Sequence, residues 1–403
     1  MFLNVDTIIK KAQSREIIFW GCAEDWVPKS KSLFPNVKKI IDIKHQQIGS
    51  KYGSLKCISP ESIFKETKKN FIVITSASTE SISEVLQENN WVPGEDYAFS
   101  PVFYDFKEIS EFDNLNLNLI LSTSDYPISK NKRRSSRLGG GLFSLKIESS
   151  QYTLNKLIEG SIRQFYFCKE ENLLYAVEYV TGKILVINSN FEIERKISVD
   201  INHMTGISIY KDSIIIMSSA NDNFIFLNKN TGKIEKKINF GKKSDSGLGL
   251  HHINDCWLHD GNLYFSYFSK SGYWKHDVYD GGISVLELDT NKITDVLHNL
   301  FQPHTPMILN NSLHFFESTL GKFYTSSHFN PFQTNGFLRG LDIFNDNYVI
   351  GQSETLYMTR AKSLNHIMLN SGIYIYNEKS KLTRFYDTPG IKNIHCLSIN
   401  RFK

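Results

Sequence analysis

Several features that mark common protein classes are missing from this chain of 403 residues. Its five cysteines stand singly, with no CxxC pair, which argues against a disulfide framework and against a thiolate zinc site. The N-terminus has acidic and basic residues before any apolar run, unlike a secretory signal. No stretch reaches the ~18 apolar residues that a membrane-spanning helix needs. We therefore expect a soluble, cytoplasmic protein without a membrane span.

Motifs of several large enzyme classes are missing as well. The sequence contains no P-loop, HExxH, EF-hand or nucleophile-elbow pattern. No spacing suggests the paired carboxylates of a glycosidase. A net charge of +4 is too small to indicate a nucleic-acid or membrane-surface partner, so none is expected.

Aromatic residues, in contrast, are abundant. They make up 13% of the chain and are mostly Phe and Tyr, which favours a β-rich architecture. Apolar residues make up 41%, enough for an ample core. The length allows two domains, or a small domain beside a large β domain.

The first part of the chain alternates between apolar strands and helical spacing. A Ser-Pro-Glu start and a run of apolar residues on one face indicate helices between the strands. The expected strands are 16–21, 37–42 and 71–75, and the expected helices are 59–64 and 78–90. This alternation predicts a parallel sheet with right-handed crossovers, a small Rossmann-like α/β domain over residues 1–112.

A nucleotide site in this domain is only partly suggested. Gly21 ends the first strand and Asp42 follows about 20 residues later, as in a dinucleotide-binding fold. The second and third glycines of that motif are missing, and Glu24 and Asp25 stand where a pyrophosphate needs positive charge. We expect no NAD.

Residues 113–403 read as repeated short strands. Six units share a skeleton in which polar residues precede a strand, and in the first five of them a turn and a second strand follow. The units begin near 162–165, 203–207, 252–256, 303–307, 337–341 and 393–397. Four strands in a repeat of roughly 40–50 residues indicate the blade of a β-propeller.

The last unit contains one strand only, so the ring must be closed by other strands. Strands within 117–157 precede the first unit and have no other partner. We expect them to pair with the C-terminal strand at 393–400, which leaves no free sheet edge. Six blades is the prediction, and seven is the alternative because the fourth unit is short.

Four sequence segments resemble a bacterial six-bladed β-propeller family of unknown function. They are HHIND at 251–255, DGG at 280–282, PHTP at 303–306 and RGLD within 339–342. The resemblance covers about residues 117–403. The N-terminal layout, with WG, a strand ending in Asp and ISPE, resembles Rossmann-like modules fused to glycan-assembly proteins. These resemblances imply a glycan-assembly context and carry over no catalytic residue.

Residues at the start of each innermost strand converge at one mouth of a propeller channel. Four histidines stand at such positions and could bind a divalent metal (Zn, Mn or Ca), with Asp255 or Glu317 completing the site. The proposed metal ligands are His203, His252, His304 and His395. The proposed catalytic residues are His251, His252, Asp255 and Arg339. The alternative is that these side chains only hydrogen-bond backbone groups and water.

Basic and aromatic residues provide candidates for substrate binding. Arg339 could clamp a carboxylate or phosphate, or instead pair with Asp342 or Asp255. The proposed substrate-binding residues are Arg163, Asn254, Thr305, Tyr273 and Trp274. The basic run 130–137 could close over a nucleotide sugar, or form a solvated loop.

Two functions follow from these candidates. The first is an enzyme of carbohydrate or surface-glycan biosynthesis that acts on an anionic sugar or nucleotide sugar, by metal-assisted lyase, hydrolase or epimerase-type chemistry. The alternative is a non-catalytic glycan-binding or scaffold protein. A homo-oligomer or a glycan-assembly partner would fit either function.

Overall fold

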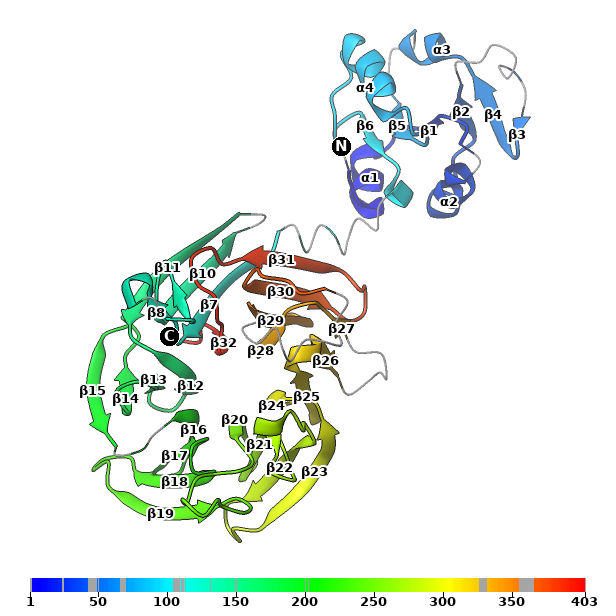
Figure 1. The fold of residues 1–403 in the computed structure, drawn as a ribbon. Coiled ribbons are helices and arrows are strands. Elements are labelled where there is room, and N and C mark those ends of the chain that lie inside the picture. Colours follow the sequence, from blue (N-terminus) through cyan, green and yellow to red (C-terminus); the bar gives the residue numbers. More distant parts are fainter. Residues whose placement is uncertain are drawn as a thin grey trace. The chain divides into compact units, whose positions relative to one another are not determined.

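The fold is given by a computed structural model (Figure 1). It describes residues 2–23, 25–42, 49, 51–65, 70–103, 109, 112, 114–130, 132–148, 151–199, 201, 203–325, 332–354 and 366–402. Two compact units are present, Met1–Leu115 and Asn116–Lys403. No helix among the described residues is long and apolar enough to cross a membrane.

The first unit is built on a six-stranded sheet with the order β3-β4-β2-β1-β5-β6. The strands are β1 (Ile17–Trp20), β2 (Lys39–Ile41), β3 (Lys51–Tyr52), β4 (Leu55–Ile58), β5 (Phe71–Ile74) and β6 (Tyr97–Phe99). The helices are α1 (Val5–Ala12), α2 (Trp26–Leu33), α3 (Pro60–Phe64) and α4 (Thr79–Glu88), and η1 (Pro101–Phe103) is a 3-10 turn. All pairings are parallel except that of β3 with β4.

Continuous apolar strands explain this sheet, because β1 and β5 are buried on both faces. Phe19 and Val73 pack into one core cluster, while Ile18 and Ile72 pack into a second. The parallel α/β sheet agrees with the expectation from the sequence. The Rossmann-like assignment of this unit stays a prediction.

Gly21 is explained by packing. It has a φ of +107°, and a Cβ there would lie 2.2 Å from the Cβ of Ser76. Only glycine allows this approach of the two chain segments at the ends of β1 and β5. Burial and a hydrogen bond with Asp42 raise the pKa of the nearby Cys22 thiol above its usual range. Glu24, which counted against a pyrophosphate site, lies outside the described residues.

The second unit contains six four-stranded sheets in a ring, with β12, β16, β20, β24, β28 and β32 innermost (Figure 1). It is a six-bladed β-propeller, and the seven-blade alternative is wrong for the part of the chain described.

Four of the blades, from β12 to β27, follow one another along the chain. β12 (Ile162–Cys168), β13 (Leu173–Glu178), β14 (Lys183–Ile187) and β15 (Ile193–Ser198) form one sheet. β16 (Met204–Tyr210), β17 (Ser213–Ser218), β18 (Asn223–Asn228) and β19 (Ile234–Asn239) form the next. β20 (Ile253–His259), β21 (Asn262–Tyr267), β22 (Gly281–Glu287) and β23 (Ile293–Leu300) follow. β24 (Pro303–Leu309), β25 (Ser312–Glu317), β26 (Lys322–Tyr324) and β27 (Phe332–Gln333) make a blade whose last strands are short.

Two further sheets complete the ring. β28 (Phe337–Phe344), β29 (Asn347–Ser353), β30 (Gly372–Asn377) and β31 (Thr383–Asp387) form the fifth. The sixth joins both ends of the unit: β7 (Asn116–Thr123), β10 (Gly141–Glu148) and β11 (Gln151–Glu159) pair with β32 (Cys396–Ile399) in the order β11-β10-β7-β32. Cys396 stands opposite Ser122 in this sheet. A short pair, β8 (Tyr126–Pro127) with β9 (Ser135–Ser136), lies outside the blades.

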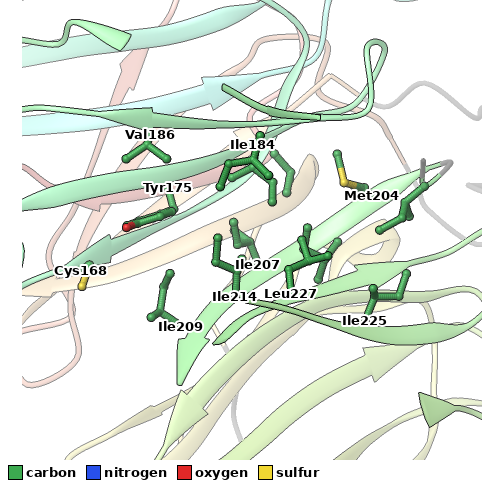
Figure 2. Close-up of a cluster of buried hydrophobic side chains, with 14 residues drawn as sticks. Cys168, Tyr175, Ile184, Val186, Met204, Ile207, Ile209, Ile214, Ile225 and Leu227 are labelled. Carbon is green, nitrogen blue, oxygen red and sulfur yellow. The ribbon is translucent and has the colours of Figure 1, made fainter. Parts of the chain in front are cut away.

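Apolar side chains hold neighbouring blades together. Figure 2 shows the cluster formed by the sheets β12–β15 and β16–β19, in which Ile184, Ile207 and Leu227 are fully or almost fully buried. Each such side chain contributes about 1.5–3 kcal/mol through burial. This packing fixes each blade against the next and therefore fixes the spacing of the inner strands.

A β-bulge follows the first residues of the inner strand in five blades. The register with the neighbouring strand shifts after Ile162, Met204, Ile253, His304 and Leu338. A bulge turns a side chain out of the normal alternation of a strand. The residues at these bulges include Arg163, Thr205, Asn254, Thr305 and Arg339, which share one position in the sequence repeat.

Candidate functional site

A pocket of about 400 Å³ opens at the end of the propeller where the inner strands begin. Its lining residues come from segments of all six blades. We call it the mouth pocket; it is lined by Arg134, Arg163, Tyr179, His203, Ser219, Ala220, Leu248, Gly249, His252, Phe268, Trp274, Lys275, Gln302, Phe337 and Arg339.

The charge of the mouth pocket has one sign. Four cationic side chains line it: Arg134, Arg163, Lys275 and Arg339. Among the described residues that form the lining there is no carboxylate. A concave surface with charges of one sign attracts ligands of the opposite sign, so this pocket favours anions.

Arg163 is the most desolvated of these cations. Its side chain comes from the bulge of β12, and its guanidinium lies 4.2 Å from the ring centre of Tyr179. The Nε atom is buried and has no hydrogen-bond partner among the described residues. Burial, assisted by the cations of Arg134 and Arg339, lowers the pKa of Arg163. A buried cation with an unused donor is stabilised when an anion binds beside it.

Arg339 is held by two histidine rings. Its Nη1 donates to Nδ1 of His395 over 2.7 Å, and its Nη2 donates to Nε2 of His304 over 2.6 Å. Because guanidinium has no acceptor, each of these ring nitrogens must be unprotonated. Burial, together with the cations of Arg163 and Arg339, lowers the pKa of both histidines well below the usual value. Both rings are therefore neutral acceptors.

The opposite ring nitrogens are also engaged. Nδ1 of His304 lies 2.8 Å from Oγ of Ser318 and 3.1 Å from the carbonyl oxygen of Gln302. Nε2 of His395 lies 2.6 Å from Oγ of Ser124. Asn254 Nδ2 also approaches His304 Nε2, at 2.8 Å. We call Arg339, His304, His395 and Asn254 the central layer.

The predicted metal site does not form. A metal would need the ring lone pairs of His304 and His395, which accept hydrogen bonds from Arg339. His203 and His252 line the mouth pocket and make contacts of their own there, whereas His304 and His395 are not part of its lining. Across the described part of the chain, no group of three or more His, Cys, Asp or Glu side chains could hold a metal ion. The donor set thus does not fit a divalent metal.

Glu317, the other expected metal partner, is committed to the structure. Its carboxylate accepts hydrogen bonds from the backbone N–H of Phe301 (2.7 Å) and from the hydroxyl of Tyr324. Of the two alternative partners of Arg339, Asp342 pairs with Arg401 at 2.6 Å, and Asp255 lies within reach of the charge of Arg339.

Asp255 and Thr305 lie beyond the central layer. Oδ2 of Asp255 accepts from the backbone N–H (3.1 Å) and the hydroxyl (3.2 Å) of Thr305. Burial raises the pKa of Asp255, and the cation of Arg339 opposes this shift. Both residues line a second cavity of about 570 Å³ along the inner strands, together with His395. They were expected at the mouth, and instead face this second cavity.

His251 does not reach the pocket either. Its Nε2 accepts from the backbone N–H of Lys242 over 2.9 Å, and its Nδ1 lies 2.9 Å from the carbonyl oxygen of Ser269. Its ring packs on Phe240. Both nitrogens are used within the fold, so the predicted catalytic role of His251 has no structural basis.

His252 and Trp274 form an aromatic wall of the mouth pocket. The ring of His252 lies 4.5 Å from that of Phe268 and 4.7 Å from that of Trp274. Trp274 belongs to a short turn, η3 (Trp274–His276), in an insertion between β21 and β22. Asp280 holds this insertion by accepting from Ser269 Oγ (2.5 Å) and from the backbone N–H of Ser271 (3.0 Å).

Tyr273, by contrast, is 59% exposed and is not part of the pocket lining. The basic run contributes Arg134 to the lining, while Asn131 lies outside the described residues. Two further 3-10 turns complete the list of elements: η2 (Ile128–Lys130), which ends at the first residue of the basic run, and η4 (Ser318–Leu320), which follows β25.

Sequence reasoning missed Tyr179, which contacts both Arg163 and His203. The repeat contained the signal, because the residue just after the second strand of a blade reaches the mouth in several blades. Tyr179 follows β13, Ser219 follows β17 and Phe268 follows β21. Aligning the exits of the second strands, and not only the starts of the first, would have found these three residues.

Comparison with known proteins gives similarity in fold only. No family model matches the sequence, and neither does any curated protein. Among solved structures, a chain of a nidogen/laminin complex is 10% identical, with a TM-score of 0.47 over 71% of this chain and 98% of that chain. Regucalcin, a calcium-binding protein from Agrobacterium tumefaciens str. C58, is 12% identical (TM-score 0.41, 58% and 76% covered). A luciferin-regenerating enzyme is 13% identical (TM-score 0.42, 57% and 76% covered). Similarities this low carry no argument about activity.

Proposed function

We propose that the mouth pocket binds an anionic sugar. The carboxylate or phosphate of this sugar would lie between Arg163 and Arg339. The observation that carries this proposal is the charge of the pocket, four cations with no carboxylate among the described lining residues. A guanidinium matches the planar geometry of a carboxylate and can donate two hydrogen bonds to it.

Size and wall chemistry favour a sugar over an inorganic ion. A volume of about 400 Å³ lies in the range of small-molecule pockets. Tyr179, Phe268, Trp274 and Phe337 give the pocket aromatic faces, on which the apolar face of a sugar ring can pack. Sugar acids, sugar phosphates and nucleotide sugars all combine a ring with an anion, which keeps the proposed role within carbohydrate or surface-glycan biosynthesis.

The central layer prepares the pocket for binding. Arg339 is oriented by two neutral, buried imidazoles before any ligand arrives. A side chain that is already ordered loses less conformational entropy on binding. The fixed guanidinium groups supply the positive charge that neutralises the anionic ligand, and no metal-dependent step is proposed.

The test is calorimetric titration with D-galacturonate and with D-galactose, which differ at the carboxylate. We expect the acid to bind and the neutral sugar to bind at least about 10-fold more weakly, the value of one charge-assisted hydrogen bond. Arg163→Met should weaken galacturonate binding by about 10- to 100-fold. Arg195→Met removes the same charge from β15, where Arg195 contacts backbone carbonyls, and should leave affinity unchanged.

Equal affinity for galacturonate and galactose, or an unchanged affinity in Arg163→Met, would contradict the proposal. Affinity should also fall with added salt, because an ion pair at a partly open mouth is screened.

A non-catalytic glycan-binding or scaffold function is the second candidate. It is favoured by Tyr273, which is 59% exposed next to Trp274 on the insertion. An exposed aromatic face beside a pocket suits a longer glycan that runs over the rim. If Tyr273→Ala weakened binding of oligosaccharides and left binding of monosaccharides unchanged, this function would gain support.

A further inference from the structure

We infer that Tyr179 and His203 form an acid–base pair that removes the proton α to the carboxylate of a uronic acid held in the mouth pocket. This inference rests on the proposed function and adds a reaction class to it. The substrate class is a hexuronic acid, free or in a 4-O-linked chain. The sequence offered His203 only as a metal ligand, and no comparison points to this pair.

The pair stands at the junction of two blades. Tyr179 follows β13 and His203 precedes β16, and both line the mouth pocket. The Tyr179 hydroxyl lies 2.6 Å from Nδ1 of His203, and the two rings meet edge to face with centres 5.1 Å apart. A phenol and an imidazole at hydrogen-bond distance inside a pocket can exchange a proton and pass it to a ligand.

The surroundings of His203 keep its imidazole neutral, while the 2.6 Å contact of Nδ1 with the Tyr179 hydroxyl makes this nitrogen the acceptor of the pair. Burial and the nearby cation of Arg163 lower the pKa of His203 below 6.5. The imidazole is therefore neutral at pH 7. Its Nδ1, at hydrogen-bond distance from the hydroxyl, is positioned to take the phenolic proton as the phenolate forms beside the cation of Arg163. The groups that face it are Tyr179 on its own blade junction and Arg163 on β12.

Arg163 links the pair to the anion site. Its guanidinium lies 4.2 Å from the centre of the Tyr179 ring, so negative charge developing on the phenol oxygen has a cation beside it. An α-proton next to a carboxylate is weakly acidic, because its removal adds a second negative charge to the carboxylate. Arg163 and Arg339, placed around that carboxylate, would stabilise the enediolate that forms.

The proposed step balances without any co-reactant. His203 Nδ1 takes the hydroxyl proton of Tyr179, and the phenolate oxygen takes the α-proton of the sugar. The C–H electron pair becomes the new C=C bond as the bond from the β-carbon to its oxygen breaks. The leaving oxygen then takes the proton from His203. When no leaving group departs, returning a proton to the α-carbon gives exchange with solvent or inversion.

The test follows the α-proton directly. D-Galacturonate, D-glucuronate and their 4-O-linked disaccharides are incubated with the full chain in D2O. Proton NMR reports loss of the α-proton signal, and ultraviolet absorbance reports a conjugated unsaturated product. We expect exchange or elimination with at least one of these substrates, and a rate that falls about 100-fold or more in Tyr179→Phe and in His203→Asn. Affinity measured by calorimetry should change less than about 3-fold, since neither group forms the anion clamp.

Tyr210→Phe is the matched control, because Tyr210 bonds Asp289 and is not part of the pocket lining. Its rate should equal that of the wild type. The wild-type rate should fall as acid protonates His203, and His203→Asn should lack this acidic limb. If Tyr179 and His203 had only a structural role, the two substitutions would change the stability of the protein and would not lower the rate while leaving the affinity nearly unchanged.

Each other outcome overturns the inference. If galacturonate binds but none of the four compounds exchanges or eliminates, the acid–base role is wrong and the anion site remains. If none of the compounds binds, the proposed function falls as well. If turnover persists undiminished in Tyr179→Phe and His203→Asn, the reaction belongs to other residues.

Discussion

At the scale of single residues, the guanidinium of Arg339 decides the chemistry of two histidines. It supplies donors to one nitrogen of His304 and of His395, so those nitrogens can neither bind a metal nor carry a proton. Residue types alone could not reveal this, because the same four histidines suit a metal site or a hydrogen-bonded layer equally well. The difference lies in the direction of each ring, which only the packed structure defines.

This arrangement predicts an acid-sensitive fold. Both histidines have a pKa well below 6.5 in the folded protein. Below pH 6.5 the unfolded chain binds protons that the folded chain does not, so stability is present above pH 6.5 and is lost as the pH falls. Each imidazole should cost about 1.4 kcal/mol per pH unit in that range.

Urea unfolding between pH 7 and pH 5 measures this loss. His395→Gln removes one of the two groups and should flatten the dependence on pH. Because burial raises the pKa of Asp125, Asp222 and Asp255, these carboxyls stabilise the fold as the pH falls, so the decisive comparison is between wild type and variant. The same pH dependence in the wild type and in His395→Gln would mean that His395 is protonated in the fold as readily as in the unfolded chain.

At the scale of elements, the β-bulges of the inner strands place the functional side chains. The repeat in the sequence correctly grouped Arg163, Asn254 and Arg339 at one position, because every blade repeats the same strand and turn. It misplaced His251, whose neighbour His252 reaches the pocket. His252 stands just before β20 with a φ of +55°, so these two residues do not follow the side-chain alternation of a strand, and a repeat alignment cannot tell which of them reaches the pocket.

Gly340 at the bulge of β28 allows a matched test. Its φ is +77°, and a Cβ there would lie 2.9 Å from the backbone nitrogen of Leu397. Gly340→Ala should destabilise the propeller and weaken anion binding, because it displaces the neighbouring Arg339. Gly261→Ala is the control. Gly261 has a similar φ of +73°, but a Cβ there would lie no closer than 3.6 Å to another group, the Tyr210 hydroxyl.

Both glycines therefore incur the left-handed backbone penalty of about 1 kcal/mol, and only Gly340 should affect binding. Thermal unfolding and galacturonate titration separate the two effects. Equal affinities in the two variants would show that the bulge does not position Arg339.

At the scale of the whole propeller, the mouth pocket exists only because the ring closes. Its lining draws on segments of all six blades, and β32 supplies the inner strand of the sheet that β7 begins. The six-bladed ring could be predicted from the sequence, since strand spacing and the unpaired last strand require closure. The central layer, which lies between the mouth pocket and the second cavity, could not be predicted from the sequence. It depends on side chains from several blades that meet at hydrogen-bond distance.

The central claim is that Arg163 and Arg339 hold the anionic group of a sugar, and a crystal structure with bound D-galacturonate tests it most directly. The account predicts carboxylate oxygens within about 2.7–2.9 Å of both guanidinium groups, with the sugar ring against Trp274 or Phe268. A sugar bound in the second cavity, or one whose carboxylate points away from both arginines, would contradict it.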